Sequence, residues 1–150
     1  MNLAMKNKFA QQYASNYVET SVIEATPYKL VKLLYEAALK NLAVSKVFVE
    51  RKDMEKKSEH VNKVIAILHG LKAGLDLEKG GDVAGNLWAL YDYMIRRTFE
   101  ASLKNDLEVF AEVAGLIKDL NEAWALMPEN YQNLDASQVR RMRLQAPASS

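Results

Sequence analysis

Apolar residues recur every three to four positions along most of this chain, a spacing typical of amphipathic helices. A first helix is predicted from Pro27 to about Glu50, because Thr26 is a favourable N-cap and proline is favoured at the first helical position. This helix carries two adjacent apolar stripes: Leu30, Leu34, Ala37, Val44 and Phe48, interrupted by Asn41, and then Val31, Tyr35, Ala38, Leu42 and Val49. Together the stripes are wider than one helix contact requires.

The second helix is predicted from about Met54 to Glu78, ending at Gly80–Gly81. Its repeat is formed by Val61, Val64, Ile65, Leu68, Leu71, Lys72 and Leu75. The third helix should be capped by Asp82, and it again carries two stripes. These are Val83, Leu87, Leu90, Tyr91, Met94, Thr98 and Ala101, and beside them Ala84, Trp88, Ile95, Phe99 and Leu103.

The fourth helix should follow the turn and cap at Asn105–Asp106 and stop at Pro128, with Phe110, Val113, Ile117, Leu120, Trp124 and Met127 on its apolar face. Four such helices predict an all-α, antiparallel up-down-up-down four-helix bundle over residues 26–128. We expect Leu34, Leu68, Leu87 and Ile117 in its core. Residues 1–25 would form an N-terminal arm. Residues 129–150 would form a tail, in which Asp135 or Ser137 would cap a short helix carrying Val139, Met142 and Leu144.

Composition narrows the function classes. The chain has 150 residues, with 20 Lys and Arg against 19 Asp and Glu, and this balance argues against a nucleic-acid partner. It has no cysteine, which excludes disulfides, thiolate metal sites and thiol nucleophiles. The apolar runs are too short to span a bilayer, and the first twenty residues do not resemble a signal peptide. We therefore expect a cytoplasmic protein without a membrane span.

Candidate catalytic chemistry is scarce. Neither His60 nor His69 has a glutamate three residues earlier, so the helical pair used by two-metal bundles is missing, and we expect no metal and no cofactor. Gly80–Gly81 lacks the spacing of a phosphate-binding loop. The serines have no nucleophile-elbow context. We interpret the C-terminal arginines, Arg140, Arg141 and Arg143, as a solvated helix face rather than a basic patch. The chain is thus not expected to be an enzyme.

The apolar surplus is the more informative feature, since tyrosine-rich apolar stripes are typical of interfaces. Six residues of the helical stripes fit either the core or a peptide-binding groove: Tyr35, Leu71, Leu75, Leu90, Tyr91 and Met94. In the arm, Phe9, Tyr13 and Tyr17 share one helical face in a stretch too short to be stable alone. The arm is therefore either a frayed leader or a segment that lies in the groove until a partner displaces it.

An ordered series of short motifs resembles the flagellar export chaperone FliS family. The series is Tyr17-Val18-Glu19-Thr20, Thr26-Pro27, Leu34-Tyr35-Glu36, Leu71, Leu75-Asp76, Gly80-Gly81, Asn86-Leu87, Leu90-Tyr91-Asp92-Tyr93-Met94 and Trp124. The resemblance implies an antiparallel helical bundle without catalytic activity. It also implies binding of the disordered C-terminal segment of flagellin, which would be kept unpolymerised until type III flagellar secretion, with Tyr13 and Tyr17 of the arm as a gate. Contact with the flagellar export machinery is a further expectation.

A different class of function remains open. The same stripes would also suit a self-associating helical-bundle adaptor without a flagellin client. The chaperone is expected to be a monomer or a weak homodimer, whereas the adaptor would be an obligate dimer.

Overall fold

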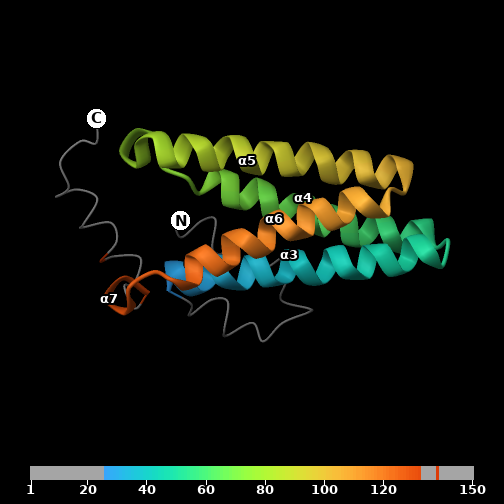
Figure 1. Cartoon of the computed structure of the whole chain (residues 1–150), viewed down its shortest axis with the longest axis horizontal. Coiled ribbons are helices and arrows are strands. Elements are labelled where there is room, and N and C mark those ends of the chain that lie inside the picture. The colour runs from blue at the N-terminus through green and yellow to red at the C-terminus, as the bar shows by residue number, and fades with distance from the viewer. Residues whose placement is uncertain (1–25, 133–137, 139–150) are drawn as a thin grey trace.

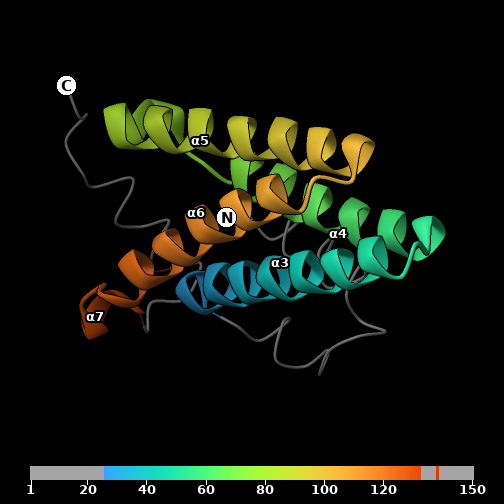
Figure 2. The same cartoon turned by 45° about the vertical axis from the view of Figure 1, so that its right-hand side comes forward.

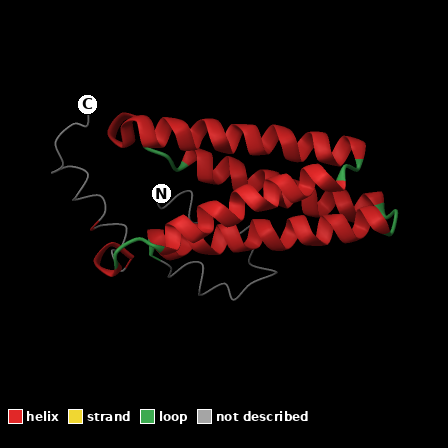
Figure 3. Ribbon diagram, in the orientation of Figure 1, coloured by secondary structure: helices red, strands yellow, loops and turns green. Residues whose placement is uncertain are grey.

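This computed structural model describes residues 26–132 and residue 138, and within them the chain forms an all-α four-helix bundle, as predicted (Figures 1 and 3). The four long helices are α3 (Pro27–Glu50), α4 (Met54–Ala73), α5 (Leu77–Lys104) and α6 (Leu107–Ala125). A single turn, α7 (Glu129–Gln132), follows. Among residues 26–132, none of the helices combines the length and the hydropathy that a membrane-spanning segment needs.

The helices close into a ring of contacts, because α3 packs on α4, α4 on α5, α5 on α6 and α6 back on α3. In two views, α6 crosses obliquely from the end of α5 to the start of α3 (Figures 1 and 2). Its far end is fixed there by Trp124, whose ring stacks on Tyr28 with 5.9 Å between centroids. The Trp124 indole nitrogen also donates to the Tyr28 carbonyl oxygen at 3.0 Å.

Most helix ends lie where the sequence predicts them, because capping side chains fix them. The Thr26 hydroxyl accepts from the Lys29 amide and starts α3 at Pro27. The carboxylate of Asp106 accepts from two amides of the first turn of α6. These contacts satisfy amide groups that would otherwise have no partner in the helix.

The junction between α4 and α5 differs from the prediction. α4 ends at Ala73 with Gly74 as its C-cap, and α5 begins before the glycine pair. The predicted cap at Asp82 is wrong, because Asp76 caps α5 by accepting from the Lys79 amide at 2.9 Å. Gly81 interrupts the helix with φ 57° and ψ −140°, a conformation open to glycine. The glycine pair thus bends the start of α5 instead of ending α4.

The core is one apolar cluster drawn from all four long helices. Leu34, Leu68 and Ile117 are buried in it as expected, while Leu87 is only partly buried. The polar interruption of the first stripe, Asn41, is also buried, and it donates to the Ala37 carbonyl oxygen at 2.8 Å. An apolar stripe therefore tolerates this amide because its hydrogen bonds are satisfied.

Two predictions fall outside the described residues. The arm aromatics and the helix predicted beyond Asp135 belong to segments that the structure does not describe. The short α7 lies just before that predicted helix. Where it meets the bundle, the Thr26 hydroxyl donates to the Gln132 carbonyl oxygen at 3.0 Å.

Candidate binding surface

The six residues predicted to be core or groove lie in or against the central apolar cluster. Tyr35, Leu71, Tyr91 and Met94 are buried in it. Leu75 and Leu90 pack against its edge and are only partly buried. Among the six candidates, Leu75 and Leu90 are therefore the ones with appreciable exposed surface.

The two buried tyrosines bind each other. Their hydroxyl oxygens are 2.6 Å apart and connect α3 to α5, which are not sequence neighbours. Burial raises the pKa of both Tyr35 and Tyr91 above the ordinary value, so both hydroxyls stay protonated. The sequence suggests that these tyrosines belong to an interface, but in the structure their hydroxyls form a hydrogen bond with each other inside the bundle.

Exposed apolar side chains gather instead along α5. Phe99 is 57% exposed, Leu103 is 71% exposed and Trp88 is 39% exposed. Positions 88, 95, 99 and 103 fall on one helical face, and Ile95 among them is partly buried. We call these four residues the α5 stripe: Trp88, Ile95, Phe99 and Leu103. It is the outer part of the second stripe that the sequence assigns to this helix.

The α4-facing edge of the α5 stripe carries fixed charges. The Lys72 ammonium of α4 lies 4.0 Å from the centroid of the Trp88 ring, a cation–π contact. It also pairs with Asp92 at 3.1 Å, and Asp92 pairs with Arg96 at 3.3 Å. The hydrogen bond from Lys72 lowers the pKa of the Asp92 carboxyl, which therefore stays ionised. The indole is thus held beside α4 with part of its surface open.

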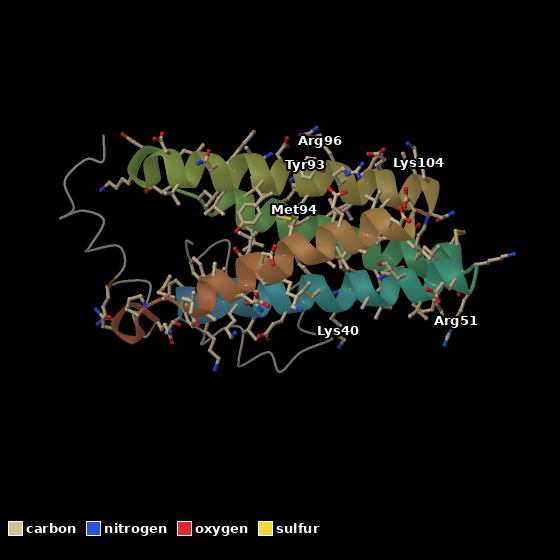
Figure 4. The ribbon with its side chains drawn as sticks, in the orientation of Figure 1. Lys40, Arg51, Tyr93, Met94, Arg96 and Lys104 are labelled. Atoms are coloured by element: carbon tan, nitrogen blue, oxygen red, sulfur yellow. The ribbon has the colours of Figure 1, made fainter. Side chains whose placement is uncertain are left out.

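The side of α5 that faces α6 is polar and occupied. Tyr93 donates to the Glu112 carboxylate, and Arg97 bridges Glu112 at 2.7 Å and Glu100 at 2.9 Å. The hydrogen bond from Arg97 lowers the pKa of Glu112 below its ordinary value. Figure 4 shows Met94 pointing from α5 into the bundle and Arg96 pointing away from it. The stripe is therefore the apolar face that runs along α5, while the exposed Leu77 and Val83 lie near the start of the helix.

This surface can bind apolar groups, and it holds little that could perform chemistry. Within the described ranges, no three His, Asp or Glu side chains are grouped so as to hold a metal ion. The sequence identified the stripe positions, but its candidates for core or groove are other residues, drawn from α3, from α4 and its end, and from α5. Spacing alone does not tell which of two adjacent apolar faces a neighbouring helix covers.

Comparisons with known proteins agree with the sequence resemblance. The family model described as flagellar protein FliS matches residues 9–131. The flagellar secretion chaperone FliS of Salmonella typhimurium is 46% identical over 113 residues, which cover 75% of this chain and 84% of that protein. The flagellar secretion chaperone FliSB of Pseudomonas aeruginosa is 38% identical over 117 residues, 78% of this chain and 93% of that protein. The Vibrio cholerae flagellar secretion chaperone FliS is 33% identical over 129 residues, 86% and 95% of the two chains.

Proposed function

The chain belongs to the flagellar protein FliS family, and from this membership we propose that it is a flagellar secretion chaperone. Its client is the disordered C-terminal segment of flagellin, which it binds in the cytoplasm and keeps from polymerising before type III secretion. The observation that carries this proposal is the α5 stripe, since soluble helices normally bury such a face or lend it to a partner. It acts by binding alone, without catalysis.

The energetics of such a complex are favourable. Each large apolar side chain buried against the stripe gains ~1.5–3 kcal/mol. Ordering a disordered segment costs about 2–5 kcal/mol or more, and association entropy opposes binding further. The net affinity is therefore well below the gross gain from burial, which leaves the client able to dissociate at the export machinery.

We place the client along α5, over the stripe and over Leu75 at the edge of the core cluster; Leu90 shares the α6-facing side of α5 with Tyr93 and Arg97 and lies outside this path. In this proposal Tyr35, Leu71, Tyr91 and Met94 form the floor beneath it, as buried residues that shape the surface. The arm residues Phe9, Tyr13 and Tyr17 act as a gate that competes for the same apolar surface. A flagellin end that assembles through apolar helices is blocked when those side chains are covered.

Titration calorimetry with a synthetic flagellin C-terminal segment tests the proposal. Replacing Phe99 and Leu103 together by Ser should weaken binding by roughly tenfold or more, because two exposed anchors lose their apolar contact. Leu126→Ser is the matched control, since Leu126 is 84% exposed but lies at the end of α6. No heat with the unmodified chain, or equal losses in both variants, would remove the proposal.

Tryptophan fluorescence provides a second readout. In a Trp124→Phe background the signal comes from Trp88, because the chain has two tryptophans. Covering Trp88 with the client should shift its emission to shorter wavelength. An unchanged spectrum at saturating peptide would place the client away from the stripe.

Self-association is the competing use of the same stripe, because exposed Phe99 and Leu103 could equally pair between two copies. Light scattering separates the two functions. A monomer or weak dimer that binds the flagellin segment supports the chaperone. An obligate dimer without affinity for the segment supports an adaptor.

A further inference from the structure

The near-neutral net charge conceals an uneven distribution. Residues 27–73 contain ten Lys and Arg against five Asp and Glu, a net charge of +5. Residues 74–132 contain five against eleven, a net charge of −6. The first range is the α3–α4 hairpin and the second contains α5 and α6, and each pair of helices packs side by side. The bundle therefore has a basic side and an acidic side.

Basic side chains of the α3–α4 hairpin surround an aromatic pair. The His60 ring stacks on Phe48 with 5.6 Å between centroids, and its Nδ1 lies 2.8 Å from the Asn41 Oδ1. The Lys56 ammonium lies 5.6 Å from the centroid of the Phe48 ring. Both helices thus contribute side chains to one cluster. The α3–α4 seam is defined here as Lys40, Phe48, Lys56, His60 and Lys63.

The helices place the other two lysines beside His60: Lys63 lies three residues after it on the same face of α4, and Lys40 precedes Asn41, whose Oδ1 lies against the ring. Desolvation is the largest cause of the lowered pKa of His60, and the charges of Lys63 and Lys40 lower it further. The charge of the neighbouring Glu59 opposes them and raises the pKa of His60. Lys40 points away from the bundle in Figure 4. Lys40 is also exposed, so its charge is directed toward solvent.

Apolar surface continues from the seam along α3. Val47 is 42% exposed and lies seven residues after Lys40, on the same helical face. A helix that docked here would meet positive charge and an aliphatic side chain along one line. This mixture differs from the α5 stripe, where apolar surface dominates.

We propose that the α3–α4 seam, together with Val47, is a docking surface for an acidic amphipathic segment of a partner protein. The segment places carboxylates near Lys40, Lys56 and Lys63 and an apolar side chain on Val47. The attraction comes from the summed charge of the lysines and does not require any of them to be unpaired. The surface lies on α3 and α4, so this partner is additional to the client proposed for α5.

The local charges favour a protein segment over a polyphosphate. Glu59 is next to His60, and Glu50, Asp53 and Glu55 lie nearby in the sequence, so an unbroken row of phosphates would meet repulsion. A peptide can place its carboxylates only opposite the lysines. One face of Phe48 is also covered by His60, which limits base stacking of the kind used for single-stranded nucleic acid.

The two histidines provide an internal control for the test. The probe is a synthetic helical peptide with Glu on one face and Leu on the other, and its counterpart carries Lys in place of Glu. Added to the full chain, the acidic peptide should shift the NMR signals of the His60 ring and raise its pKa. The ring signals of His69, exposed on the same helix, should stay in place. An unmoved His60, or an equal response to the basic peptide, would overturn the proposal.

Charge reversal localises the effect. Lys56→Glu with Lys63→Glu should weaken the acidic peptide roughly tenfold, whereas Lys79→Glu with Lys118→Glu should weaken it less than about twofold. Position 56 is in the first turn of α4, where glutamate favours the helix, so the seam variant should fold. Binding to the unmodified chain should also fall as salt rises. Equal losses in both variants overturn the proposal, as does tighter binding of inorganic polyphosphate or phosphatidylserine vesicles than of the peptide.

Discussion

The Tyr35 and Tyr91 hydroxyls satisfy each other inside the bundle at 2.6 Å. Two buried polar groups that pair cost little, whereas one left alone in the interior carries its full desolvation penalty. The contact therefore stabilises one arrangement of α3 relative to α5. A rearrangement that separated the two helices would leave each buried hydroxyl without its hydrogen-bond partner, at a cost in free energy.

A double-mutant cycle tests that coupling. Tyr35→Phe or Tyr91→Phe alone should lower the free energy of unfolding by about 1–3 kcal/mol, since each leaves one buried hydroxyl without its partner. The double variant should lose less than the sum of the two, because neither hydroxyl remains. Urea denaturation measures all four proteins. Strictly additive losses would show that the hydroxyls do not interact.

His60 should make stability depend on pH. Desolvation, and then the charge of Lys63, lower its pKa in the folded state below the ordinary 6.5. The stability it contributes is therefore complete above about pH 6.5 and is lost as the pH falls through the folded pKa. His60→Gln should reduce the loss of thermal stability between roughly pH 6.5 and pH 5. Identical pH profiles for the two proteins would contradict this assignment.

For single residues, the sequence predicts the character of a position better than it predicts which residue that position contacts. It indicates that the tyrosines have an interface character, and it marks Asn41 as an interruption of an apolar stripe. The structure pairs Tyr35 with a residue 56 positions away and Asn41 with His60, 19 positions away. Such pairings depend on how the helices meet, which local spacing does not encode.

Among the elements, the start of α5 depends on Asp76 and Gly81. Asp76 supplies the cap, and Gly81 takes a φ of 57° that allows one turn of helix before the long segment. A glycine pair in a sequence is equally compatible with a helix end or a bend. The predicted boundary was wrong here because an aspartate upstream was already capping the next helix.

Gly81→Ala should destabilise the protein by roughly 1–3 kcal/mol, because a Cβ is strained in this backbone conformation. Gly85→Ala is the matched control four residues later in the same helix. A Cβ there would meet no atom within 4 Å, so the variant should be neutral or more stable by about 0.5–1 kcal/mol. Thermal unfolding compares the two. Similar melting temperatures for both variants would argue against the bend.

The two candidate caps can be compared directly. Asp76→Ala should cost about 0.5–2 kcal/mol, because it removes the acceptor of the Lys79 amide. Asp82→Ala should stay within about 0.5 kcal/mol of the unmodified chain, as expected of an exposed surface position. Chemical denaturation of both variants decides between them. A larger loss at Asp82 would restore the boundary predicted from the sequence.

For the whole molecule, the fold class follows from features that act locally. Thr26, Asp106 and the long apolar repeats predict four helices with short connections, and an antiparallel bundle is the simplest way to bury their stripes. The location of the surplus apolar surface is less predictable. It depends on which face of α5 its neighbours cover, with α6 running obliquely toward Tyr28 and the stripe left outside.

The apolar surface and the basic surface lie on different helices of the bundle. The central apolar cluster fills the interior. The α5 stripe exposes apolar side chains, and the α3–α4 seam carries positively charged ones. A chaperone that must hold a client and still be recognised by other proteins benefits from such a division.

Methyl NMR with the flagellin C-terminal segment tests most directly whether α5 is where the client binds. The methyl signals of Ile95 and Leu103 should shift most, because the segment is expected to cover the stripe. The signals of Val113 and Ile117, buried in α6, should shift least. Saturable binding with shifts confined to other helices, or no binding at all, would contradict the proposed use of this surface.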